Sequence, residues 1–171
     1  MFSAILLLGL VPQTVASSTA RVPTPAAAPT SSVVAIRAAR PPLIDGRASD
    51  EVWRAVPAIT AFREARPTED AEPKLATEAR VAYDERNLYV LVRAFDAHPD
   101  SIVRRLARRD ADVSSDWITL YVDSYHDRRT GFRFAVNPAG VKQDGVLYND
   151  GDEDWAWDGG WEATARVDSA G

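Results

Sequence analysis

The stretch between residues 144 and 161 concentrates the side chains best suited to hold a metal ion. It is rich in acidic and aromatic residues and contains no Lys or Arg. Asp150, Asp152 and Asp154 have the every-second-residue spacing of calcium loops, in which several oxygens surround a hard cation. The match to an EF-hand is partial, because Trp155 stands where that loop needs a Gly. The pattern leaves two interpretations: a calcium site at these three aspartates, or a solvated acidic loop.

The tryptophans of this stretch suit a second kind of ligand. Flat aromatic rings stack on the apolar C–H faces of sugars, and Trp155 and Trp157 would share one side of an extended segment. Such a pair would form a carbohydrate-binding platform. The alternative is that the two rings cap the core, where large aromatic residues are commonly packed. Trp53, in an expected helical turn at 50–55 capped by Ser49, is predicted to be a core residue on the same grounds.

Composition argues against several other functions. The chain has 171 residues, a net charge of −5 and a pI of about 5.0, which disfavours nucleic-acid binding through a basic face. It has no Cys, and only His98 and His126 could contribute to a histidine zinc site. The sequence has no motif of a serine hydrolase, zinc protease, P-loop or dinucleotide fold, and no spacing singles out two carboxylates for glycoside hydrolysis. The sequence therefore singles out no catalytic residues.

A basic run lies upstream of the acidic stretch. Its members are Arg104, Arg105, Arg108 and Arg109. Runs of this kind are usually solvated loops, but this one could also pair with the acids at 150–158, which have no basic residues near them in the sequence. We include Arg109 among the candidate ligand-binding residues, together with Trp117, which begins a strand on the side opposite its expected core residues.

The first 32 residues differ in composition from the rest of the chain. In residues 1–20 an apolar run of eight is followed by small residues, which is typical of a secretory signal peptide, although no Lys or Arg precedes the run. Residues 21–32 are rich in Pro, Ala, Ser and Thr and are predicted to form an extended linker. No apolar stretch reaches the length of a transmembrane helix. We expect an exported protein, located in the periplasm, the outer envelope or outside the cell.

Residues 33–171 are predicted to form an all-β, antiparallel β-sandwich, because short alternating runs are separated by turn signals at regular spacing. The expected strands are 32–37, 77–83, 88–95, 116–123, 132–136, 141–148 and 161–167, and 101–110 is expected to be a short strand leading into a loop. In 116–123 the residues Ile118, Leu120 and Val122 should face the core. The chain stops at a turn signal, Asp168–Gly171, so we expect a fragment of a longer protein that lacks the last strands of its sandwich.

Three motifs resemble those of family 9 carbohydrate-binding modules, over about residues 34–168. P-P-L-I-D-G-R-A-S-D-E-V-W (Pro41–Trp53) resembles the opening of that family. The pair of runs R-V-A-Y-D and N-L-Y-V, at 80–84 and 87–90, resembles its hairpin, and Ser115–Asp123 resembles its central strand. The later run, from Asp127 to Trp161, resembles a subgroup in which such a domain is the N-terminus of a larger bacterial envelope protein.

The resemblance implies a noncatalytic β-sandwich that binds a poly- or oligosaccharide, often with structural calcium. It implies a partner in the C-terminal region of the same parent protein, which would act in carbohydrate catabolism. Asp116 matches the family's binding-strand motif and becomes a candidate ligand-binding residue. Sugar-binding members carry a Trp just before this acidic residue, and residues 112–116 contain none. Two alternatives therefore stay open: a structural or docking domain without sugar binding, and part of a glycoside hydrolase whose catalytic region lies elsewhere.

Overall fold

A computed structural model describes residues 32–149 and 151–171. The chain divides into two units, Met1–Ser32 and Val33–Gly171, and the second holds every element described below. The predicted signal peptide and nearly all of the predicted linker lie outside the described residues. Within the described part of the chain, no helix is long and apolar enough to cross a membrane.

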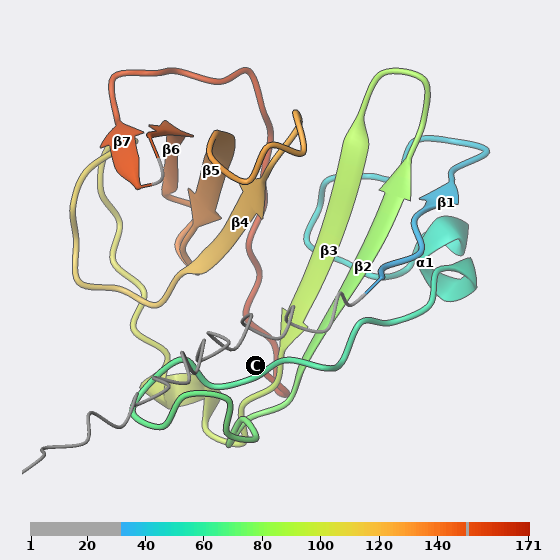
Figure 1. Cartoon of the computed structure of the whole chain (residues 1–171). Coiled ribbons are helices and arrows are strands. Elements are labelled where there is room, and N and C mark those ends of the chain that lie inside the picture. The colour runs from blue at the N-terminus through green and yellow to red at the C-terminus, as the bar shows by residue number, and fades with distance from the viewer. Residues whose placement is uncertain (1–31, 150) are drawn as a thin grey trace, which may run out of the picture. The chain divides into compact units, whose positions relative to one another are not determined.

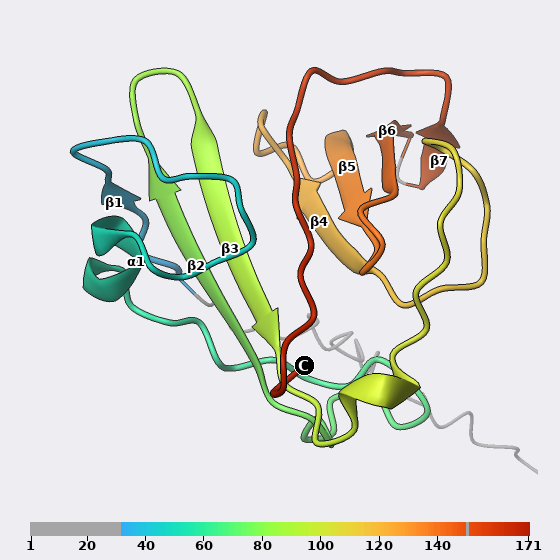
Figure 2. The ribbon, with the colours of Figure 1, turned by 180° about the vertical axis from the view of Figure 1, so that it is seen from behind.

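The second unit is built from two sheets (Figures 1 and 2). The first has the order β1 (Ile36–Arg37), β2 (Thr77–Tyr83), β3 (Leu88–Ala94), and β1 is parallel to β2. The second is antiparallel in the order β4 (Ile118–Val122), β5 (Gly131–Val136), β6 (Lys142–Tyr148), β7 (Asp152–Asp154). The only helices among the described residues are α1 (Glu51–Ala55) and the 3-10 turn η1 (Pro99–Ser101). The prediction of an all-β sandwich fold is confirmed.

The main apolar core lies between α1 and the first sheet. Trp53 of α1 is 5% exposed and packs with Val56, Ala82 and Tyr89. Ala82 and Tyr89 are direct cross-strand partners in the β2–β3 hairpin, so the alternation of the strands presents both to the helix. The predicted core role of Trp53 is confirmed. The expected cap is wrong, because Asp50 and not Ser49 precedes the first helical residue.

The turn of this hairpin is held by one carboxylate. Asp84 Oδ1 accepts the backbone N–H groups of Arg86 and Asn87, and Oδ2 accepts the Tyr89 hydroxyl at 2.6 Å. These hydrogen bonds favour the ionised carboxylate, and the largest contribution, from Tyr89, helps lower the pKa of Asp84 to about 2. The same bond raises the pKa of Tyr89. The turn residues thereby fix the register that brings Tyr89 into the core.

The two faces of the β4–β7 sheet differ in what covers them. On one, which we call the Trp157 face, Phe132 and Phe134 contact Trp157 with ring centroids 5.0 and 6.0 Å away, and Trp161 packs on Phe134. The opposite face, which we call the Trp155 face, carries Tyr121, Arg133 and Trp155. The odd and even residues of each strand separate onto these faces, as strand geometry requires.

Two expected strands are absent from the structure. Residues 102–110 follow η1 as a loop without strand pairing, and residues 161–167 are extended but form no ladder. The second segment runs between β3 and β4 in both views (Figures 1 and 2). Isolated hydrogen bonds hold this segment in place. The Thr164 hydroxyl donates to the Ile44 carbonyl, and Lys142 Nζ donates to the Trp161 carbonyl. Its side chains alternate in exposure, which explains why the sequence predicted a strand.

Candidate functional site

A row of side chains crosses the Trp155 face from one edge of the sheet to the other. Tyr121 on β4 is the cross-strand partner of Arg133 on β5, which is in turn the partner of Gly145 on β6. Trp155 follows the last residue of β7 and completes the row. Both aromatic side chains are accessible to solvent, with Tyr121 58% and Trp155 48% exposed. The row therefore presents two open rings with a cation between them.

Trp155 and Arg133 are in direct contact across β6. The guanidinium carbon of Arg133 lies 4.7 Å from the centroid of the Trp155 ring, within the range of a cation–π interaction. The ring has room because β6 carries Gly145 there; a Cβ on that glycine would lie 3.6 Å from Trp155 Cε3 and 3.1 Å from the Asp154 carbonyl oxygen. Arg133 Nη2 donates to Gln143 Oε1 at 3.3 Å, while its buried Nη1 has no hydrogen-bond partner among the described residues.

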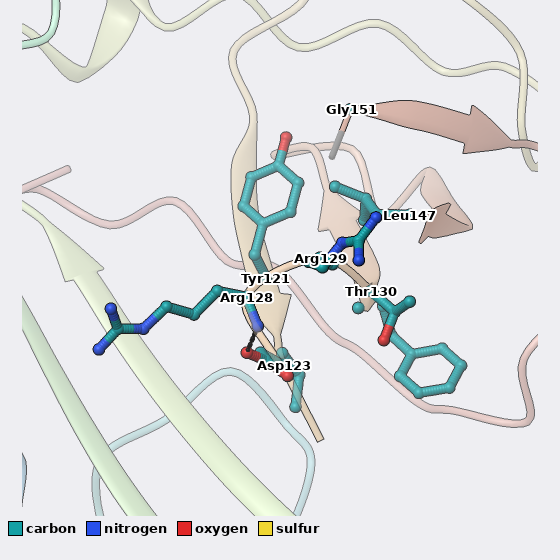
Figure 3. Close-up of a pocket in the computed structure, with 10 residues that line it drawn as sticks. Tyr121, Asp123, Arg128, Arg129, Thr130, Leu147 and Gly151 are labelled. Atoms are coloured by element: carbon teal, nitrogen blue, oxygen red, sulfur yellow. Dashed lines mark hydrogen bonds between the residues drawn. The ribbon is translucent and has the colours of Figure 1, made fainter. Parts of the chain in front are cut away.

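A hollow of about 340 Å³ adjoins this row, and Tyr121 forms one of its walls (Figure 3). Gly131 and Leu147, direct partners in the β5–β6 ladder, also line it. Its other lining residues are Val122, Asp123, Arg128, Arg129, Thr130, Phe132 and Gly151. A sugar ring stacked on Tyr121 would therefore have polar and charged groups of the β4–β5 connection beside it.

The β4–β5 connection at the rim of this hollow is fixed by two carboxylates. Asp123 accepts the backbone N–H of Arg128 at 2.8 Å and that of Asp127 at 3.2 Å. Asp127 in turn accepts the backbone N–H groups of Arg129 and Thr130 and the Thr130 hydroxyl, each at 2.8 Å, and these bonds lower the pKa of Asp127. These hydrogen bonds fix the backbone of the turn, and therefore the positions from which the Arg128 and Arg129 side chains extend.

Arg109, a predicted ligand-binding residue, is instead part of an ionic cluster on the Trp157 face. Its Nη2 donates to Asp144 Oδ1 at 2.5 Å and to the Gly159 carbonyl at 2.9 Å, and lies 2.5 Å from Asp158 Oδ1. Burial opposes ionisation of Asp144, which is fully buried, but the Gly159 N–H and Arg109 outweigh it and lower the pKa of this carboxyl. The predicted pairing of the basic run with the acidic stretch is confirmed for Arg109.

The two tryptophans expected to form one platform lie on opposite faces of the sheet. Trp155 covers Arg133, whereas Trp157 packs on Phe132 and its ring lies so close to Gly159 that a Cβ there would be 2.6 Å from it. The expectation of a shared side is wrong because β7 ends at Asp154 and the chain turns at residues 155–156. The alternation of an extended strand therefore does not continue through this segment.

The remaining predicted ligand-binding residues lie just before β4. Two hydrogen bonds join Asp116 to Val103. The Asp116 N–H donates to the Val103 carbonyl, and Asp116 Oδ2 accepts the Val103 N–H at 2.8 Å. The carboxylate therefore fastens the loop that leads into β4. Trp117 is half-buried. Neither residue belongs to the row formed by Tyr121, Arg133 and Trp155.

The predicted calcium ligands are only partly described. Asp150 lies outside the described residues. Asp154 Oδ1 accepts the Ala156 N–H at 2.9 Å, and Asp152 Oδ2 lies 3.5 Å from the Asn149 side-chain nitrogen. Within the part of the chain that the structure describes, no group of three acidic, His or Cys side chains could hold a metal ion. Calcium binding therefore stays a prediction.

Sequence reasoning did not select Tyr121, Arg133 or Gly145 as site residues. A signal for two of them was present, because Ile118–Val122 and Phe132–Val136 alternate strictly. That alternation places Tyr121 and Arg133 opposite the apolar residues of their strands. No local pattern indicates that Trp155 would cross β6 to reach Arg133, since this contact depends on the turn after β7.

Comparison with known proteins identifies the family. The sequence model of a family described as carbohydrate family 9 binding domain-like matches residues 44–136, more than half of the chain. The matched range contains Tyr121 and Arg133 and ends before Trp155. No curated protein and no solved structure matches the chain. Binding of carbohydrate in general is the function that this match supports, and the chain belongs to the carbohydrate family 9 binding domain-like family.

Proposed function

We propose that this module binds a poly- or oligosaccharide at its Trp155 face, without catalysis, and targets a larger exported protein to that carbohydrate. The observation that carries the proposal is the pair of open rings, Tyr121 and Trp155, on either side of Arg133 in a family of carbohydrate-binding domains. Trp157 and Trp161, by contrast, pack on the phenylalanines of the opposite face.

The chemistry of the row suits a sugar ring. The apolar face of a pyranose stacks on an aromatic ring, and its hydroxyl edges need hydrogen-bond donors and acceptors. Arg133 supplies N–H donors beside the rings, the Tyr121 hydroxyl can donate and accept, and the hollow next to Tyr121 provides space for a substituent. Such contacts give modest affinity, and linkage to a larger protein would raise the effective concentration at a polysaccharide surface.

The direct test measures binding of the full chain to a panel of soluble polysaccharides by affinity electrophoresis and calorimetry. We expect Tyr121→Ala and Trp155→Ala each to weaken binding at least tenfold, because stacking area is lost. Tyr83→Ala is the matched control, since that tyrosine is also exposed, at 42%, and lies on β2 in the other sheet. Binding that is unchanged in both row variants, or lost equally in the control, would overturn the proposal.

A structural or docking domain without sugar binding is the second candidate. It is favoured by residues 112–116, which lack the Trp that sugar-binding relatives are expected to carry, and by the use of the Asp116 carboxylate to hold Val103. This candidate predicts no binding to any member of the polysaccharide panel.

Export and calcium binding are separate parts of this proposal. Export is supported by the composition of residues 1–20, and is tested by locating the mature chain and sequencing its N-terminus. Calcium is supported by the spacing of Asp150, Asp152 and Asp154, of which the described residues supply only two.

A further inference from the structure

We propose that the saccharide bound at the Trp155 face is acidic, with uronate carboxylates or sulfate esters that Arg133 and Arg128 bind. This inference rests on the proposed saccharide-binding function and narrows its substrate class. The relevant geometry is the position of two guanidinium groups relative to Tyr121. Arg133 is the cross-strand partner of this tyrosine, and Arg128 lies with it around the hollow (Figure 3).

Arg133 is a cation without an acidic partner in the described part of the chain. Its direct strand partners, Tyr121 and Gly145, are uncharged, and its contacts are the Trp155 ring and Gln143. A buried guanidinium N–H that lacks an acceptor is costly, and Arg133 Nη1 is such a group. Arg133 is half-buried rather than enclosed, so an anion can reach it while the Trp155 ring keeps its place.

Arg128 is positioned by its backbone and leaves its side chain open. Its N–H is bound by Asp123, its φ of 59° holds the left-handed conformation, and its guanidinium extends away from Leu147 (Figure 3). No ion pair involves it among the described residues. A planar guanidinium binds a carboxylate or sulfate through paired N–H groups, which a hydroxyl cannot match.

The two arginines that the proposal uses, Arg128 and Arg133, form no ion pair among the described residues. Asp123 lines the same hollow, but its oxygens already accept the backbone N–H groups of Asp127 and Arg128. An acidic sugar stacked on Tyr121 would place its anionic group beside Arg133, with Arg128 at the rim of the hollow.

The test compares matched ligands on the full chain at low salt. Oligogalacturonate is compared with its carboxyl-reduced form, and a sulfated galactan with its desulfated form, so that the two sources of negative charge are separated. We expect one acidic ligand to bind at least tenfold more tightly than its neutral counterpart, and the preference to fall as salt screens the charges.

Variants then locate the charge. Arg133→Gln and Arg128→Gln should each remove most of the preference, whereas Arg86→Gln, which removes the same charge from the exposed β2–β3 turn, should retain it. Because Arg128 lies on an exposed rim, its variant remains informative if Arg133→Gln does not fold.

The outcomes separate the two proposals. Equal binding of acidic and neutral ligands that still depends on Tyr121 would overturn the acidic substrate and leave saccharide binding intact. Equal loss in Arg86→Gln would show that the preference is only general charge attraction, and would also overturn it. Binding of no saccharide would overturn the proposed function itself.

Discussion

The Arg133 guanidinium carbon lies 4.7 Å from the centre of the Trp155 ring, although the two residues belong to segments separated by β6. The contact requires Gly145, whose missing side chain lets the ring lie over the strand. It keeps a large aromatic ring in one place at the surface while nearly half of it stays open to solvent. A ring ordered in advance loses less conformational freedom when a ligand stacks on it.

Gly145→Val tests this arrangement. The new side chain would press on the Asp154 carbonyl and on Trp155, since even a Cβ would lie 3.1 Å from that oxygen. We expect the ring to leave Arg133 and saccharide affinity to fall several-fold, with tryptophan fluorescence shifting toward the solvent-exposed spectrum. Gly160→Val is the control, because a Cβ on that glycine would have no neighbour within 4 Å. Unchanged affinity in Gly145→Val would show that the ring's position is irrelevant to binding.

Removal of the Trp155 ring and removal of the Trp157 ring should have different effects on stability and on saccharide binding. Trp157→Ala removes packing from Phe132 and Phe134 and should lower the free energy of unfolding by about 3 kcal/mol. Trp155→Ala should leave the unfolding free energy close to wild type and reduce saccharide binding instead. Urea denaturation and calorimetry of both variants measure the two effects. The reverse pattern would mean that the sequence-based alternative, with Trp155 as a core cap, is right.

The buried Asp144 should be sensitive to loss of charge. Asp144→Asn keeps the shape but weakens the bonds to Arg109 and the Gly159 N–H, and we expect it to cost about 2 kcal/mol of unfolding free energy. Asp158→Asn removes the other carboxylate beside Arg109, but that side chain is 76% exposed, so its stability should stay near wild type. Denaturation of the two variants makes the comparison, and equal effects would contradict it.

Tyr89→Phe should alter how stability depends on pH. The pKa of Asp84 is about 2 in the folded chain, against an ordinary value of 3.8. A carboxyl with a depressed pKa stabilises the fold fully above its unfolded pKa, and this contribution is lost as the pH falls through the folded value. Removing the Tyr89 hydroxyl should raise the pKa of Asp84, measured by NMR titration. The stability gap between wild type and variant should shrink as the pH falls from about 5 toward 2; a constant gap would point to lost packing alone.

Calcium, if it binds at Asp150, Asp152 and Asp154, must stabilise the fold. We expect the thermal midpoint to rise with calcium and to fall back in chelator, because a ligand of the folded state alone shifts the equilibrium toward it. Asp152→Asn should abolish the shift and Asp158→Asn should retain it. A midpoint that does not respond to calcium would favour the solvated acidic loop.

Local patterns were sufficient for the strands that pair with their sequence neighbours. The β2–β3 hairpin and the β4–β5–β6 meander follow from alternation and turn residues, and the core role of Trp53 follows from its size and its place in a helical turn. The segment 161–167 has a strand's alternation but no ladder partner, which alternation alone does not reveal. Pairing depends on neighbours that are distant in the sequence.

The binding row was harder to predict for the same reason. Arg133 and Tyr121 can be assigned to one face from the sequence, but Trp155 joins them only because the chain turns after Asp154. The pairing of Arg109 could be predicted in part, because the basic run has few acidic neighbours in the sequence and the acidic stretch has no basic ones. The fully buried carboxylate that receives it, Asp144, lies in a strand whose burial follows from tertiary packing.

The Arg109–Asp144 contact also restricts which substitutions relatives of this chain can carry. Loss of Arg109 would leave the fully buried Asp144 carboxylate without its cation, whereas Arg109 without Asp144 would keep Asp158 beside it. Related sequences that lack the arginine should therefore lack the carboxylate too, for instance with two apolar side chains of similar combined volume. Paired substitution at positions 109 and 144 would be the evolutionary trace of a contact that neither the basic nor the acidic run reveals by itself.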